Sequence, residues 1–242
     1  MGESLFWHRR FAEEEAGFRF LERFLQPGMT VLDAGAHEGY YTLFASKRVG
    51  RGGKVIAFEP SPRERKALRW HVLINRCWNV RIQGLALGEE NGEADLHIVD
   101  GVQTGLNSLR PPAIAGRAGI LKVRVTSLDD WLRVHDLDRA DFIKLDVEGA
   151  ELSVLKGASG LLRRRPRPVI YAEVEDRRTQ PWGYRASEIV TTLDALEYEW
   201  FQPESDGKLV AIGPEREEFQ ANLVAVPKER RAEVLCRTNQ TC

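Results

Sequence analysis

Apolar residues occur along the chain in short runs that alternate with segments of helical spacing. The short runs are rich in strand-favouring residues and lie at residues 29–32, 54–58, 80–87, 141–147 and 168–174. The segments with helical spacing lie at residues 40–44, 62–75 and 150–162. Strands that alternate with helices of this length predict a mostly parallel sheet with helices on both faces. We therefore expect a doubly wound α/β fold.

Two stretches depart from this alternation. Residues 88–138 are an insertion after the third strand, and we expect them on the substrate side of the sheet. Within the insertion, strands are predicted at residues 93–99 and 121–125. The loop between them, at residues 101–119, contains glycine and proline. Near the end of the chain, short strands that are antiparallel at the sheet edge are predicted at residues 198–202, 209–212 and 219–226.

The length of 242 residues fits one domain of this fold with short additions at its ends. Phe18 and Leu21 fall at helical spacing, so residues 1–28 are interpreted as an N-terminal cap helix. Residues 29–227 are interpreted as the single α/β domain. Residues 228–242 are interpreted as a polar tail, which we expect to fray.

Charge and cysteine content narrow the expected partners and compartment. The 35 Lys and Arg residues nearly balance the 36 Asp and Glu residues, so the chain has no overall attraction for nucleic acid or anionic lipid. Neither nucleic acid nor a membrane is therefore expected as a partner. The three cysteines are few and unpatterned, which argues against a disulfide framework and a zinc cluster. Because residues 1–17 contain no apolar leader, we expect a cytoplasmic protein.

The turn after the first predicted strand is the first candidate site. Asp33 ends the strand, and Gly35 and Gly39 follow at a Gly-x-x-x-Gly spacing. Such a turn lies at the carboxyl edge of an open α/β sheet, where glycine lets the backbone pass close to a ligand. Dinucleotide sites use a different glycine spacing, and a negative Asp33 suits a sulfonium better than a pyrophosphate. The turn therefore favours S-adenosylmethionine over a nicotinamide nucleotide.

Glu59 is the second part of this candidate cofactor site. It ends the second strand about 20 residues beyond Gly39, where a carboxylate can accept both hydroxyls of an adenosine ribose. Taken singly, the glycines could be ordinary turn residues and Glu59 a solvated strand end. Their combination in a strand-turn-helix-strand unit favours cofactor binding.

Residues 141–151 contain a second candidate site. Strand alternation places Asp146 and Glu148 at the carboxyl edge beside the first turn, where Gly149 lets the chain bend. Glu173, near the end of the following strand, points to the same edge. Clustered carboxylates can orient a hydroxyl or amine, accept its proton or hold a divalent cation, although no metal ligand is assigned here.

The chain contains, in order between residues 28 and 173, the segments VLDAGAHEGYYTLFAS, VIAFEPSP, NRCWNV followed by ALGEENG, VTSLDDW and DFIKLDVEGAELSVLKGA. These segments resemble the successive motifs of the FkbM family of S-adenosylmethionine-dependent methyltransferases. The IKLDVEGAE signature is the specific part, because the glycine motif alone indicates only a class I methyltransferase. The resemblance implies a mostly parallel, seven-stranded, Rossmann-like methyltransferase sheet.

The resemblance also implies roles for single residues. Asp33 and the two glycines would hold the methionine end of the donor, Glu59 its ribose and Ala86 its adenine, with Asp146 near the reacting methyl. The expected cofactor-binding residues are thus Asp33, Gly35, His37, Gly39, Glu59, Ser61, Ala86 and Asp146. The expected catalytic residues are Asp146, Glu148 and Glu173.

Some of these residues have a second interpretation. The family usually has Asn-Ile where this chain has His37-Glu38, so His37 can still face the cofactor but its contacts do not follow from the resemblance. An imidazole in a ligand loop can serve as a general base, but most such histidines are loop residues. Acidic residues are also favoured at helix N-termini, and Glu151 is better explained in that way.

We therefore expect a methyltransferase that uses S-adenosylmethionine to methylate a hydroxyl of a small molecule, sugar or natural product. An N-methyltransferase of the same fold, a nicotinamide-dependent oxidoreductase and a cofactor-binding sensor without turnover are the alternatives. The oligomeric state is not predicted.

Overall fold

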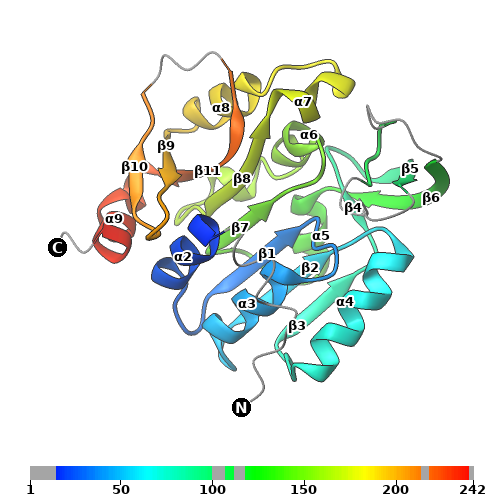
Figure 1. Cartoon of the computed structure of the whole chain (residues 1–242), viewed down its shortest axis with the longest axis horizontal. Helices are drawn as coiled ribbons and strands as arrows, with labels where there is room; N and C mark the ends of the chain where they lie inside the picture. The colour runs from blue at the N-terminus through cyan, green and yellow to red at the C-terminus, as the bar shows by residue number, and fades with distance from the viewer. Residues whose placement is uncertain (1–14, 100–106, 112–117, 214–217, 240–242) are drawn as a thin grey trace.

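The computed structural model describes residues 15–99, 107–111, 118–213 and 218–239, which form a sheet of eight strands, a sheet of three strands and flanking helices. The large sheet contains, in spatial order, β10 (Leu209–Ala211), β9 (Tyr198–Pro203), β11 (Gln220–Pro227), β8 (Val169–Glu175), β7 (Phe142–Leu145), β1 (Thr30–Ala34), β2 (Lys54–Phe58) and β3 (Val80–Gln83). Figure 1 shows this sheet crossing the molecule from β10 to β3. The expected α/β fold is confirmed, with eight strands instead of seven because β10 pairs with β9 as an extra edge strand.

Strand direction follows the expectation from the sequence. The five neighbouring strands from β8 to β3 are parallel, whereas β11 runs antiparallel to both β8 and β9. The predicted antiparallel strands at the sheet edge are thus confirmed. Because the carboxyl ends of the parallel strands meet at one edge, residues that follow β1, β2 and β7 come together there.

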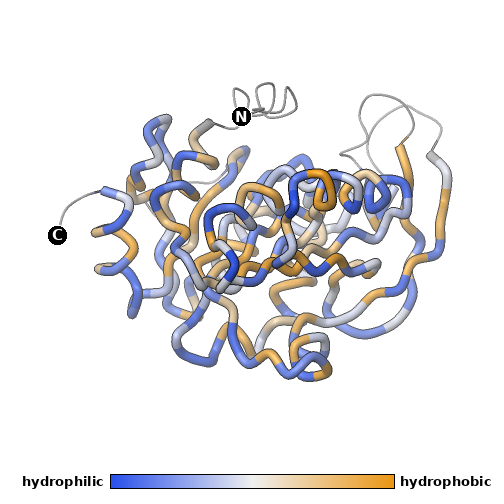
Figure 2. The backbone as a smooth tube through the Cα atoms, turned by 90° about the horizontal axis from the view of Figure 1, so that it is seen from below, coloured by the Kyte–Doolittle hydropathy of each residue, from blue (hydrophilic) through white to orange (hydrophobic). Residues whose placement is uncertain are grey.

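Helices cover both faces of the large sheet. One face carries α2 (Glu15–Phe24), α3 (Tyr40–Val49), α4 (Pro62–Ile74) and α9 (Arg231–Asn239), and the other carries α5 (Leu128–Val134), α6 (Glu151–Lys156) and α8 (Ser187–Asp194). Successive side chains along a strand point to opposite faces of the sheet, so each strand contributes to both layers of the core. Val31 packs with α2 and α3, whereas the next residue, Leu32, packs with α5, α6 and α8. Figure 2 shows many of the apolar positions in the interior of the molecule.

A second sheet accounts for the insertion after β3. In it, β6 (Ala118–Thr126) pairs in parallel with β4 (Ala86–Leu87) and antiparallel with β5 (Gly92–Val99). The two strands predicted inside the insertion are confirmed. The single strand predicted at 80–87 is wrong at its end, because the chain turns at Gly84 and divides into β3 and β4 of different sheets. At that glycine a Cβ would lie only 2.9 Å from the guanidinium carbon of Arg65.

The predicted loop at 101–119 is described only in part. Ser108 forms an isolated antiparallel bridge with His97 of β5, which ties this part of the insertion to the second sheet. Residues 118 and 119 belong to β6. Positions 101–106 and 112–117 lie outside the described residues.

The N-terminal cap helix is confirmed for residues 15–24, and its predicted first part, residues 1–14, lies outside the described residues. α2 packs its aromatic side chains on the centre of the sheet, with ring centroids 5.7 Å apart for Phe24 and Phe142 and 6.0 Å apart for Phe20 and Tyr171. The amphipathic spacing seen in the sequence thus matches a helix that lies on the sheet.

The expectation of a frayed polar tail is wrong for residues 228–239. They form η4 (Lys228–Arg230) and α9, which contacts α2. Val234 and Thr238 lie four residues apart and are both buried, so one narrow face of an otherwise polar helix is enough to dock it. Residues 240–242 lie outside the described residues.

Membrane crossing and cysteine chemistry can be checked against these elements. No helix within the described ranges has the length and apolarity needed to cross a bilayer. Cys77 is a buried free thiol, whereas Cys236 on α9 is disulfide-bonded. The unpatterned cysteines did not predict that bond.

Candidate functional site

A cleft opens at the carboxyl edge of the large sheet, beside the second sheet. Its volume is about 580 Å³ when the open mouth and the adjoining solvent space are included. The predicted site residues that line it are Gly35, His37, Glu59, Ala86, Asp146 and Glu148. The predicted residues that are not part of its lining are Asp33, Gly39, Ser61 and Glu173. The structure therefore brings together residues from four separate segments of the chain.

Glu59 lies at the end of β2 and is held by the backbone around the cleft. Its Oε2 accepts a hydrogen bond of 2.8 Å from the backbone N–H of His37, and its Oε1 accepts one of 2.8 Å from that of Ser61. Burial raises the pKa of this carboxyl to about 7, although both hydrogen bonds act in the opposite direction. Each oxygen keeps a second lone pair, so a ligand hydroxyl can still bind.

The glycines of the first turn are required by packing within the protein. Gly35 has φ 80°, and a Cβ there would lie 1.7 Å from the backbone oxygen of Asp146. Gly39 has φ 96°, and a Cβ there would lie 2.4 Å from Cδ1 of Leu68 on α4. The sequence assigned both glycines to close approach of a ligand. The structure gives another reason, which is that the β1 turn packs directly against the β7 turn and against α4.

Asp33 and Ser61 lie behind the wall of the cleft. The Asp33 carboxyl is buried and accepts a hydrogen bond of 2.5 Å from the hydroxyl of Thr42, and burial raises its pKa to about 6. Ser61 is the buried N-cap residue of α4, and its hydroxyl donates to Glu64. Both residues support the loops that line the cleft, and their direct contact with a cofactor stays a prediction.

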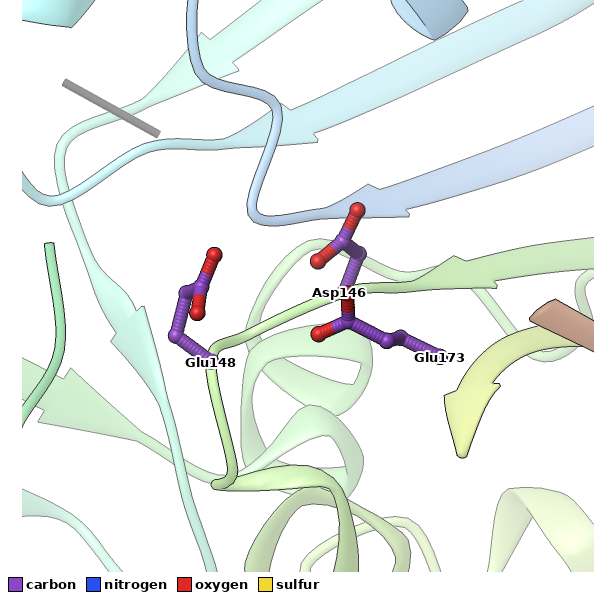
Figure 3. A group of neighbouring side chains, drawn as sticks. All are labelled: Asp146, Glu148 and Glu173. Atoms are coloured by element: carbon purple, nitrogen blue, oxygen red, sulfur yellow. The ribbon is translucent and has the colours of Figure 1, made fainter. Parts of the chain in front are cut away.

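Three carboxylates converge beside the cleft, as Figure 3 shows for Asp146, Glu148 and Glu173. One oxygen of each lies within 4.8 Å of the others. Asp146 follows β7, Glu173 lies on the neighbouring strand β8, and Glu148 lies in the turn between β7 and α6. We call these three residues the carboxylate cluster. Oxygen ligands of this kind suit a hard divalent cation, but they also suit a hydroxyl or ammonium group.

Burial, and after it the crowding of negative charge, raise the pKa values in the carboxylate cluster. Burial, and then the charge of Asp146, raise the pKa of Glu148 to about 8. The same two causes, with the charge of Glu148 added, raise the pKa of Glu173 well above its usual value. The cluster therefore holds protons at neutral pH that isolated carboxylates would release, which is the condition expected for groups that exchange protons with a substrate.

Two cations that contact the carboxylate cluster were not predicted from the sequence. Lys144 is buried in the middle of β7, with Nζ 2.9 Å from Oδ2 of Asp146. Arg178, on the short helix α7 (Asp176–Thr179), places Nη1 2.9 Å from Oε2 of Glu148 and Nε 3.7 Å from Oε2 of Glu173. A lysine within a buried strand is itself a signal of a buried partner. No spacing in the sequence pointed to Arg178.

Glu151 has the structural role that the sequence suggested. It is buried at the start of α6, and its Oε1 accepts hydrogen bonds from the backbone N–H groups of Val147 and Gly149, at 3.0 and 3.3 Å. Burial raises its pKa from 4.5 to about 7. Glu151 thus fixes the turn that carries Glu148.

We predict that Glu151→Gln flattens the dependence of stability on pH. In the unfolded chain Glu151 ionises near pH 4.5, but the folded protein keeps its proton until about pH 7. The free energy of unfolding should therefore fall by about 3 kcal/mol through this group as the pH rises through that window. Urea denaturation at about pH 5 and about pH 8 measures the difference. The exposed Glu90→Gln is the control, and an unchanged slope in Glu151→Gln would contradict the prediction.

Comparison with known proteins agrees with this geometry. The methyltransferase FkbM domain matches residues 33–200. The chain is 27% identical over 165 residues to 2-O-methyltransferase NoeI of Sinorhizobium fredii, covering 63% of this chain and 65% of that protein. It is 30% identical over 155 residues to methyltransferase sdnD of Sordaria araneosa, covering 52% of this chain and 59% of that protein. The alignments thus span less than two thirds of either relative.

A solved structure shows the same fold at low sequence identity. The O-methyltransferase TomG of Streptomyces achromogenes, determined in complex with SAM, is 12% identical with a TM-score of 0.52. The likeness covers 91% of this chain and 86% of that one. The predicted Rossmann-like methyltransferase fold is therefore confirmed.

Proposed function

Because the chain belongs to the FkbM methyltransferase family, we propose that it uses S-adenosylmethionine to methylate a hydroxyl of a small molecule such as a sugar or natural product. The observation that carries the proposal is the position of the carboxylate cluster at one end of a cleft that has Glu59 in its wall. A donor site and a group able to take up a proton are thereby adjacent. The family match also favours this activity over a nicotinamide-dependent oxidoreductase.

The lining of the cleft fits S-adenosylmethionine. Glu59 would accept hydrogen bonds from the ribose hydroxyls, and the apolar Leu85, Ala86 and Leu87 would contact the adenine. Gly35 and Asp146 lie together at the turn where the methionine end would be bound. When bound, S-adenosylmethionine supplies a methyl group that its sulfonium has already activated.

The residues of the chain would align the acceptor and move its proton. Asp146 lines the cleft and can accept a hydrogen bond from the acceptor hydroxyl, which orients an oxygen lone pair toward the methyl. Either Glu148 or Glu173, in its deprotonated form, would then receive the hydroxyl proton as the new O–C bond forms. Their raised pKa values make them stronger bases than ordinary carboxylates near neutral pH. Arg178 holds Glu148 in place for this step.

Methylation of an amine is the second candidate, because the carboxylate cluster would also attract an ammonium group. The printed names of NoeI and TomG describe O-methyltransferases, which favours the hydroxyl as acceptor. A screen of hydroxyl and amine acceptors with methyl-labelled donor distinguishes the two. Label found only on amines would overturn O-methylation while leaving the family assignment intact.

We predict that Glu59→Gln weakens binding of S-adenosylmethionine by about 1–3 kcal/mol, or about 5- to 150-fold. The amide places an NH₂ group where one oxygen accepted a backbone N–H, and it removes a charged acceptor for the ribose hydroxyls. Isothermal titration of the wild type and the variant with S-adenosylmethionine measures the change. The exposed Glu90→Gln should bind like the wild type.

Two titration results would contradict the proposal, one with S-adenosylmethionine and one with NAD. Unchanged affinity in Glu59→Gln would remove this carboxylate from the ribose site. Binding of NAD by the wild type without binding of S-adenosylmethionine would overturn the proposed activity as a whole.

A further inference from the structure

Exposed apolar side chains gather on the outward face of α4 and in the turn that follows it. Trp70, Leu73, Ile74 and Trp78 are 61%, 51%, 55% and 71% exposed, and we call them the α4 patch. Among the described residues, these four are the majority of the seven large hydrophobic side chains with high exposure. Scattered single apolar residues are normal on a protein surface, but a cluster of this kind marks an interaction site.

The α4 patch is the outer side of a helix whose inner side is fully used. Leu68 and Val72 pack against β2 and β3 in the interior. Trp70, Leu73 and Ile74 fall at the helical spacing that places them on the opposite side. Among the described residues, the patch therefore adds nothing to the core.

Positive charge surrounds the α4 patch. Lys66, Arg69 and Arg76 are all exposed, and none of them forms a salt bridge with the described residues. The only acidic residue between positions 62 and 81 is Glu64, which is buried and paired with Ser61 and Arg63. The near-neutral net charge of the whole chain thus hides a local excess of positive charge, and the expectation of no membrane partner rested on that net charge.

We propose that the α4 patch docks the protein onto an anionic membrane surface. Tryptophan is favoured at the membrane interface, and Leu73 and Ile74 would enter the boundary between headgroups and acyl chains. Lys66, Arg69 and Arg76 would contact anionic headgroups. A second copy of the chain fits less well, because two such patches would bring like charges together. Nucleic acid fits less well because only the two tryptophans could stack on bases, whereas the aliphatic Leu73 and Ile74 could not.

Docking by the α4 patch leaves the cleft accessible. α4 begins at Pro62, close to Glu59 at the carboxyl edge, and extends about 20 Å over its 13 residues. The patch lies toward the other end of this helix, on the edge of the sheet where β3 lies (Figure 1). Changes in the patch should therefore leave donor binding unaltered, and the proposal does not depend on the acceptor of the methyl group.

Sedimentation of the full chain with lipid vesicles tests the proposal. We expect the wild type to sediment with phosphatidylcholine vesicles that contain phosphatidylserine, and far less with phosphatidylcholine alone. The double variants Trp70→Ser/Trp78→Ser and Lys66→Glu/Arg69→Glu should each weaken binding by at least about tenfold. Val134→Ser, at a residue 74% exposed on α5, and Arg124→Glu, at an exposed position of β6, are the matched controls. Unchanged titration with S-adenosylmethionine shows that the variants remain folded.

Four outcomes would overturn the proposal. The first is equal sedimentation with and without phosphatidylserine, and the second is an equal loss of binding in the controls. The third is tight binding of an RNA oligonucleotide that depends on the α4 patch, without vesicle binding. The fourth is a dimer in light scattering that the patch variants convert to a monomer, which would assign the patch to a second copy of the chain.

Discussion

Asp146→Asn is expected to lower kcat by about 10²- to 10⁴-fold while changing the affinity for S-adenosylmethionine much less. Asp146, like Glu148, lines the cleft and belongs to the carboxylate cluster, and of the two it is the one that packs against Gly35 of the β1 turn. An amide can still accept a hydrogen bond, but it cannot supply the negative charge that orients the acceptor hydroxyl and makes its neighbours basic. Single-turnover methyl transfer and isothermal titration separate the two effects.

The pH profile gives this prediction a signature that a purely structural role would not produce. After burial, the charge of Asp146 is the largest cause that raises the pKa values of Glu148 and Glu173. A base must be deprotonated to act, so kcat of the wild type should rise with pH through the pKa of Glu148 at about 8. In Asp146→Asn both pKa values fall, and the rise of the smaller kcat should move to lower pH.

Asp141→Asn is the matched control, because Asp141 lies just before the amino end of the same strand. Its Oδ2 accepts a hydrogen bond of 2.7 Å from the backbone N–H of Thr30, away from the cleft. It should leave kcat and its pH profile unchanged. If Asp146→Asn lost donor affinity as severely as turnover, Asp146 would be a cofactor residue only. If the pH profile of kcat in Asp146→Asn did not shift, Asp146 would not control the pKa of the base.

The sequence predicted the convergence of the carboxylate cluster because that convergence depends on strand geometry alone. Asp146 directly follows β7, and Glu173 lies near the end of β8, its parallel neighbour. Alternation of side chains and the common edge of parallel strands are enough to bring them together. Glu59 at the end of β2 follows from the same rule.

Residues whose place depends on tertiary packing were missed or misjudged. Arg178 reaches the carboxylate cluster only because α7 folds back over the turn at Gly149, where a Cβ would lie 2.2 Å from the Arg178 backbone oxygen. The strand predicted at 80–87 is divided because Ala86 pairs with β6 of the second sheet. The last helix, with few apolar residues, is stabilised by docking and not by its own pattern. Local periodicity contains none of this information.

Gly35→Ala is expected to abolish binding of S-adenosylmethionine and to destabilise the fold by about 2–6 kcal/mol. Alanine at φ 80° is strained, and its Cβ would lie 1.7 Å from the backbone oxygen of Asp146. That contact cannot be relieved by a side-chain rotation, because it involves backbone. The β1 turn and the β7 turn must move apart, which deforms the wall of the cleft that both turns line.

Gly28→Ala separates the strain of the backbone from the collision with Asp146. Gly28 also has positive φ, at 89°, but no atom lies within 4 Å of its added Cβ. It should lose only about 1–2 kcal/mol and bind S-adenosylmethionine normally. Urea denaturation and titration of both variants measure the difference. If both variants lost stability and binding to the same extent, backbone strain alone would explain the effect. A loss of binding confined to Gly35→Ala would mean that the contact between the two turns shapes the donor site.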